Sequence, residues 1–183
     1  NSKNDFWETG VMNQSDFTLT SGDDKSTLYL SGQYVTQEGT TPGDKYNRVS
    51  LRLNGTRDLG NKVSVDYGAN YVQNRYDITS ATGTIYDNLL NQPDNIRITD
   101  YKDWKNNEFA NPNGFYNDYY DNPYYTKDNN RQKTRNDYLI GRIELKWHPI
   151  DVLTFTGRVG ISTYNTSYKT SVNKFVFTPY SLA

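Results

Sequence analysis

Residues 46–58 read YNRVSLRLNGTRD, and polar and apolar side chains alternate along this stretch almost one by one. One face carries Tyr46, Arg48, Ser50, Arg52, Asn54 and Thr56, and the other carries Val49, Leu51, Leu53 and Gly55. Because successive side chains of a β-strand point to opposite faces, the stretch predicts a strand with one polar and one apolar face.

The same alternation recurs along much of the chain. It is clear in 62–76, 137–147 and 152–164, weaker in 15–21 and 26–37, and weakest in a seventh segment, 170–178. Several of these segments are longer than the ~5–6 residues that are usual for strands of soluble proteins. They suit a tilted membrane strand, which needs ~9–11 residues.

Short and long connections alternate between the predicted strands. The short ones contain Gly22, Gly60 and Pro149, and the longer ones are 38–45 and 77–136. Up-and-down outer-membrane barrels have this order, with short periplasmic turns and long outer loops. The expected fold is therefore all-β, with antiparallel up-and-down strands that form part of a large transmembrane β-barrel. The long extracellular loop is expected to carry a short helix that Thr84 caps and that ends near Gln92.

Composition narrows the possible functions. The 183 residues have a formal net charge of −1, no Cys and a single His, and 15% of them are aromatic. No basic stripe indicates nucleic-acid binding, and no disulfide or thiolate metal site can form. His148 precedes Pro149 in a short turn, and no Ser/His/Asp arrangement can be built around it. We therefore expect neither an enzyme nor a nucleic-acid-binding protein.

Charged residues and aromatic rings indicate what the two faces of the strands meet. The charges on the polar face, mid-strand, are Arg48, Arg52, Asp66, Arg142, Glu144 and Arg158. In a wide barrel they would line the lumen, where they could pair with each other, hold a plug or touch substrate. Trp147 lies on the apolar face near a short turn, and Tyr34 and Tyr71 lie near the opposite ends of their strands. Rings at both rims of an apolar band are typical of membrane interfaces.

A soluble alternative remains open at this point. In a soluble all-β module the polar face would meet solvent, the apolar face would pack against a second layer, and Tyr and Trp could form a carbohydrate-binding platform. A membrane-spanning sheet cannot leave an edge in lipid, and bacterial barrels have at least ~8 strands. Six or seven strands therefore predict a piece of a larger barrel, or no barrel.

The long loop is rich in aromatic residues. The candidate contact residues in it are Trp104, Phe115, Tyr116, Tyr119, Tyr120, Tyr124 and Tyr125. Their rings could stack on sugars, anchor a partner protein or pack the loop on itself. The Asp and Asn oxygens of 117–130 could also hold a structural Ca²⁺, although the EF-hand spacing is absent. Otherwise the sequence predicts neither a metal site nor a cofactor.

Residues 16–55 read DFTLTSGDDKSTLYLSGQYVTQEGTTPGDKYNRVSLRLNG and resemble the barrel of SusC/RagA-type TonB-dependent transporters. The matching features are the glycine turn at Gly22, the Tyr-to-Glu-Gly element of 34–39, and Arg48, Arg52 and Asn54 in the following strand. Upstream, 4–7 resembles the family's Asp-Trp element. Further on, 122–124 and 135–147 resemble its next strand. The family's plug domain and TonB box have no counterpart in this sequence.

The resemblance implies a place and a function. It implies the outer membrane of a Gram-negative bacterium, with lipid around the barrel. It implies nutrient import, in which the barrel takes up oligosaccharides or peptides beneath a SusD-like surface lipoprotein that acts as a lid. Import in this family is driven through TonB, which acts on the plug.

Overall fold

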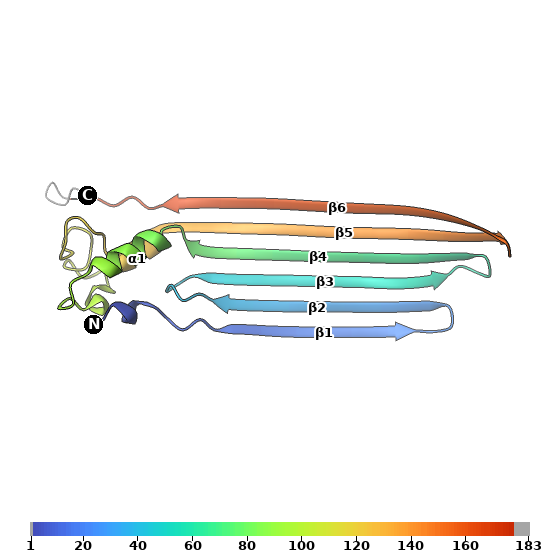
Figure 1. Ribbon diagram of the computed structural model, residues 1–183, viewed down its shortest axis with the longest axis horizontal. Coiled ribbons are helices and arrows are strands. Elements are labelled where there is room, and N and C mark those ends of the chain that lie inside the picture. Colours follow the sequence, from blue (N-terminus) through green and yellow to red (C-terminus); the bar gives the residue numbers. More distant parts are fainter. Residues whose placement is uncertain (1, 178–183) are drawn as a thin grey trace.

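The computed structural model describes residues 2–177, which form one six-stranded antiparallel sheet with two short α-helices (Figure 1). The strands lie side by side in chain order: β1 (Met12–Gly22), β2 (Ser26–Glu38), β3 (Lys45–Asp58), β4 (Val63–Thr79), β5 (Asn130–Ile150) and β6 (Leu153–Val172). The predicted all-β, up-and-down antiparallel arrangement is thus confirmed. Within the described residues the sheet is open, with β1 and β6 at its edges.

β5 and β6 extend well beyond the predicted strands: β5 begins at Asn130 rather than 137 and β6 ends at Val172 rather than 164, whereas β4 runs only to Thr79 rather than 76. Residues 131–136 of β5 pair with both β4 and β6, although this segment has neither an aliphatic nor an aromatic side chain on either face. The alternation of polar and apolar residues stops where the apolar face stops, so only the backbone pairing reveals these ends. The connection predicted as 77–136 therefore shrinks to residues 80–129.

The predicted strand 170–178 is wrong over most of its length. Residues 170–172 are the end of β6, and residues 173–177 have no regular structure. Residue 178 lies outside the described residues. The reason is that β5 is long enough to pair with β6 as far as Val172, opposite Asn130.

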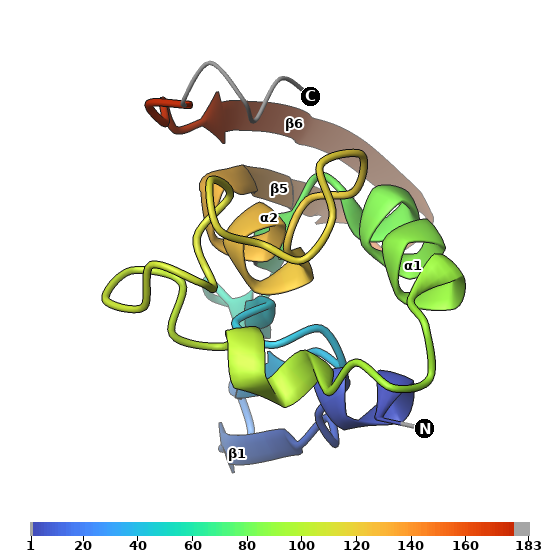
Figure 2. The ribbon, with the colours of Figure 1, turned by 90° about the vertical axis from the view of Figure 1, so that its left-hand side faces the viewer.

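Long connections gather at one end of the sheet and tight turns at the other (Figure 1). The turns β1–β2, β3–β4 and β5–β6 lie at the turn end. At the loop end, residues 80–129 pack with η1 (Lys3–Phe6) and contain α1 (Thr82–Asn91), η2 (Ile98–Tyr101) and α2 (Pro123–Asn129), as Figure 2 shows. We call residues 80–129 together with η1 the loop cap.

The loop cap has a small hydrophobic core of its own. Its buried members are Phe6, Ile85, Leu89, Ile98 and Tyr124, with Trp7 and Trp104 packed against them. The predicted short helix corresponds to α1, but the predicted cap is wrong: the residue before α1 is Ala81, and no side chain caps the helix. Burial of Ile85 and Leu89, four residues apart on one face, accounts for the position of the helix.

Two glycines lie directly beneath aromatic rings on the apolar face of the sheet. A Cβ at Gly55 would overlap the ring of Tyr67, and a Cβ at Gly32 would overlap the ring of Phe17. Each ring lies over the backbone of the glycine on the neighbouring strand, where there is no side chain. This packing stabilises one register of the two strands. These positions therefore require glycine because of close approach.

Gly55→Ala is expected to destabilise the sheet by about 1–3 kcal/mol, because Tyr67 must leave its low-energy position. Gly157→Ala is the matched control: it lies on the same face, and a Cβ there would meet nothing within 4 Å. The measurement is the thermal unfolding midpoint of the full protein in detergent. Equal midpoints for the two variants would show that the ring does not rest on Gly55.

Candidate functional site

One face of the sheet carries a continuous apolar band that crosses all six strands. Its residues lie directly opposite one another on neighbouring strands: Leu51 of β3 pairs with Tyr71 of β4, which pairs with Leu139 of β5. The large side chains of this apolar band are Phe17, Leu19, Leu28, Leu30, Tyr34, Val49, Leu51, Leu53, Val63, Val65, Tyr67, Tyr71, Leu139, Ile143, Leu145, Trp147, Phe155, Val159 and Ile161.

Nothing among residues 2–177 covers the band. Ile143 is 57% exposed and Val159 is 75% exposed, although both lie in the middle of long strands. The sheet is a single layer there, and the buried hydrophobic cluster lies in the loop cap instead. A contiguous exposed apolar surface of this extent marks contact with lipid or with another protein.

The band runs obliquely to the strands. Its centre on β6 is in register with Asp66 of β4, whereas its centre on β1 is in register with Asn70. A shift of about four residues over five strand spacings corresponds to an inclination of about 30°, at about 3.4 Å per residue and about 4.8 Å per strand. The strands of outer-membrane barrels are tilted by ~35–45°.

Aromatic rings lie at both rims of the band. At the turn end, Trp147 stacks on Phe155 with 5.5 Å between ring centroids. At the loop end, Tyr34 is exposed, and the hydroxyl of Tyr71 donates to Asp137 Oδ1 at 2.6 Å. Each Tyr thus places an apolar ring at the rim of the band. The hydroxyl of Tyr71 lies beyond the ring, next to the carboxylate of Asp137.

The opposite face of the sheet carries the charged residues predicted to line a lumen. Four of the six form two ion pairs: Arg142 with Asp66 at 3.1 Å, and Arg158 with Glu144. Lys146 lies 3.4 Å from Glu144 as well, and Glu144 is only 8% exposed. The two ion pairs therefore connect β4 with β5 and β5 with β6, and Lys146 leaves this group with one positive charge in excess.

Arg48 and Arg52 are different, because neither makes an ion pair within the described part of the chain. Arg48 Nε donates to Ser50 Oγ at 3.1 Å, and Arg52 is exposed. Both line a groove of about 380 Å³ together with Tyr29 and Asn70. The groove thus exposes two arginines without an ion pair among the described residues, with the carboxylate of Asp16 also in its lining.

The seven candidate aromatics of the loop divide into packed and accessible residues. Phe115, Tyr124 and Tyr125 are buried, and Tyr116 packs against Phe115 at 4.5 Å between ring centroids. Trp104 packs against Tyr125 at 5.1 Å, and its indole N–H donates to Asp128 Oδ2 at 2.8 Å. Tyr119 is 82% exposed and lies against Tyr120. Of the seven, Tyr119 is therefore the most accessible to a ligand or partner.

Asn122 joins three parts of the loop cap and was not among the predicted site residues. Its buried amide donates to the backbone oxygens of Tyr101 at 2.8 Å and Ala110 at 2.6 Å. Its Oδ1 accepts from the backbone N–H of Tyr124 at 2.9 Å, which caps α2, with Pro123 in the first turn. The Asn-Pro pair is a helix-start signal in the sequence, but the two remote carbonyls leave no sequence signal.

Arg131 joins the loop end of the sheet. Its guanidinium contacts Asp44 Oδ1 at 2.9 Å and Asp77 Oδ1 at 2.8 Å, and it donates to the backbone oxygen of Gly43. It thus connects β5, β4 and the turn between β2 and β3. The partners are up to 88 residues away along the chain, so sequence reasoning could not find them.

Burial raises the pKa of several residues in the loop cap, among them Tyr124 and Asp121. It raises the pKa of Tyr124 to about 12, helped by the nearby charges of Glu8 and Asp5. Burial also raises the pKa of Asp121 above its ordinary value. No three His, Asp or Glu side chains of residues 2–177 converge as a metal site, so the structure adds no support for calcium at 117–130.

Comparison with models of known protein families gives no match. Comparison with curated proteins gives no match either. Among residues 2–177, no helix has the length and apolar character needed to cross a membrane.

Proposed function

We propose that this sheet is part of the wall of an outer-membrane transport barrel. In this arrangement the apolar band faces lipid, and the face with Arg48, Arg52 and the ion pairs lines the lumen. The observation that carries the proposal is an uncovered apolar band on one face of a single-layer sheet whose other face is charged.

The dimensions of the band support this proposal. On β5 it runs from Leu139 to Trp147, which is about 27 Å along the strand. At the inclination of about 30°, its height is about 23 Å, close to the ~25 Å outward band of outer-membrane barrels. The loop end is then extracellular and the turn end periplasmic.

The resemblance to SusC/RagA-type transporters suggests what passes through. The barrel would import oligosaccharides or peptides, with a SusD-like lipoprotein above the loop cap and TonB acting through a plug. The groove with Arg48 and Arg52 would meet the plug or the substrate inside the lumen, and Tyr119 offers an accessible ring at the extracellular end. A soluble carbohydrate-binding module would need a second layer over the apolar band, and none is present within residues 2–177.

Cysteine labelling tests the membrane orientation. The chain contains no Cys, so Val159→Cys on the band and Ser162→Cys on the opposite face each add one thiol to it. In outer membranes that contain the full protein, a hydrophilic maleimide is expected to label Ser162→Cys and to spare Val159→Cys. A lipid-soluble maleimide should label Val159→Cys. Equal labelling of both thiols by the hydrophilic reagent would overturn the membrane proposal.

Uptake tests the importer. Cells that lack the gene are expected to lose uptake of one class of labelled oligosaccharide or peptide that is too large for porins, and the wild-type gene should restore it. Unchanged uptake of every oligosaccharide and peptide tested, with the protein correctly inserted, would leave a barrel that is not an importer of these substrates.

A further inference from the structure

The outward face becomes cationic four residues beyond the loop-side rim of the apolar band, past the pair Gln73 and Asp137. Arg75 of β4 lies directly opposite Arg135 of β5. One step further from the band, Lys133 of β5 lies directly opposite Lys169 of β6. We call these four residues the cationic patch. All four are on the face that carries the band, and all four are exposed.

Like charges directly opposite each other across a sheet destabilise it, and here two such pairs are adjacent. Neighbouring acids compensate only part of the charge. Arg135 pairs with Asp137 at 2.7 Å, and Lys133 lies 3.5 Å from Asp77. Asp77 also forms an ion pair with Arg131, so it compensates the charge of Lys133 only in part. Within residues 2–177, neither Arg75 nor Lys169 makes an ion pair, so the patch keeps net positive charge.

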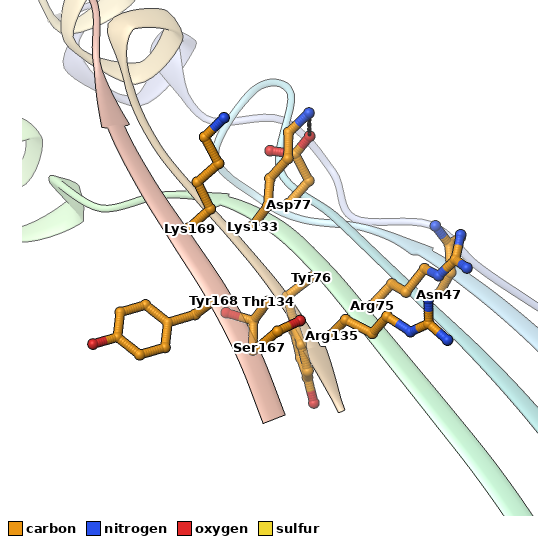
Figure 3. A pocket seen from close by; sticks show the side chains of 10 residues that line it. All are labelled: Asn47, Arg75, Tyr76, Asp77, Lys133, Thr134, Arg135, Ser167, Tyr168 and Lys169. Carbon is orange, nitrogen blue, oxygen red and sulfur yellow. Dashed lines mark ion pairs between the residues drawn. The ribbon is translucent and has the colours of Figure 1, made fainter. Parts of the chain in front are cut away.

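The patch is also concave. A groove of about 400 Å³ lies between the four cations, with Ser167 and Asn47 in its lining. Figure 3 shows Arg75 and Arg135 extending to the same side of the sheet, with Lys133 and Lys169 beyond them and the ring of Tyr168 pointing away. Arg and Lys side chains with a nearby hydroxyl and amide suit the oxygens of a phosphate group.

The position of the patch relative to the band identifies the source of that phosphate. In the membrane orientation proposed above, Arg75 and Arg135 lie four residues beyond the rim residues Tyr71 and Leu139, about 12 Å above the hydrocarbon, so their long side chains can reach down to the headgroups of the outer leaflet. The opposite rim differs: among the strand residues described there, Arg57 is the single cation on the same face. Positive charge on the outward face is thus concentrated on the extracellular side. Basic pockets at this depth bind anionic lipid headgroups.

We infer that the cationic patch binds the phosphate groups of the phosphorylated glycolipid of the outer leaflet, a lipopolysaccharide-type lipid, and holds it against the barrel. This inference rests on the proposed membrane orientation. The lipid phosphates would supply the negative charge that the opposed cations lack, so the glycolipid would stabilise the strand ends that extend beyond the band.

The test uses Arg75→Gln combined with Lys169→Gln, the two cations without ion pairs. Lys25→Gln combined with Arg57→Gln is the control, because it removes the same charge at the turn end. The full protein is placed in nanodiscs that contain phosphatidylethanolamine with either lipid A or dephosphorylated lipid A, and bound lipid A is measured by mass spectrometry. The patch variant is expected to bind lipid A about 10- to 30-fold more weakly, at about a factor of five per lost cation. The control should bind as the wild type does.

Each outcome decides between the proposals. Equal retention of lipid A and dephosphorylated lipid A by the wild type would overturn phosphate recognition, as would full retention by the patch variant. Displacement of lipid A by millimolar inorganic phosphate alone would make the site one for free phosphate. Membrane insertion is scored separately: a wild-type protein that does not enter the outer membrane would overturn the membrane orientation, and this inference with it. An inserted protein without phosphate-dependent retention would overturn only the lipid site.

Discussion

Ile143→Arg is expected to reduce strongly the assembly of the protein in the outer membrane. Ile143 lies near the middle of the apolar band and is 57% exposed. An Arg on the lipid face of a barrel costs about 2–4 kcal/mol at the bilayer midplane, which lowers the equilibrium ratio of folded to unfolded protein by a factor of about 30 to 1,000. If the band instead faced water, the same change at an exposed position would alter stability by at most about 0.5 kcal/mol.

Ile140→Arg is the matched control, because it makes the same change three residues away on the same strand but on the opposite face. Ile140 is also partly exposed, and an Arg there joins other charged side chains on the lumen side. The fraction of folded protein in the outer membrane is read from heat-modifiable gel mobility. If the two variants assemble equally well, the band does not meet hydrocarbon.

Asn122→Ala is expected to open the loop cap without affecting membrane insertion. The change removes the side chain that caps α2, a loss of about 1 kcal/mol. It also leaves the backbone oxygens of Tyr101 and Ala110 without their partner, at about 1–3 kcal/mol for each buried group. The total loss is about 3 kcal/mol or more. Because the hydrophobic core of the loop cap is small, we expect this loss to make local unfolding of the cap measurable.

Hydrogen exchange and limited proteolysis of residues 101–125 measure the opening. Asn106→Ala is the control, because Asn106 is exposed and, within residues 2–177, its amide donates a hydrogen bond only to Asp103. The Asn122 variant should exchange and be cleaved at least ten times faster in this segment, whereas the control should behave as the wild type does. Unchanged protection of the Asn122 variant would mean that the aromatic packing alone holds the cap together.

The predictions from sequence were best where a local pattern reports a local structure. Alternation of polar and apolar residues located parts of all six strands, because each side chain of a strand records which face it occupies. It missed the loop-end parts of β5 and β6, along which no regular alternation of polar and apolar residues continues. It also misplaced the start of α1, since Thr84 was expected to cap a helix that begins at Thr82. The burial of Ile85 and Leu89, and not a capping side chain, determines where this helix begins.

The candidate site was predictable only in part. The assignment of Arg142, Asp66, Arg158 and Glu144 to one face followed from parity, but their pairing into two ion pairs depends on the register between strands. The aromatic loop residues were identified by composition, whereas the separation of buried Tyr124 from exposed Tyr119 needed the packed loop. Asn122 and Arg131 act on groups far away in the sequence, which no local pattern records.

Local sequence patterns were enough to locate the central parts of the strands, the order of turns and loops, and which side chains share a face, because these depend on a period of two and on turn residues. The tertiary structure alone decided the register, and with it the oblique course of the apolar band, the opposed cations of the patch and the packing of the loop cap. These features arise from contacts between residues that lie far apart along the chain, and their energies depend on distances that only the folded backbone sets.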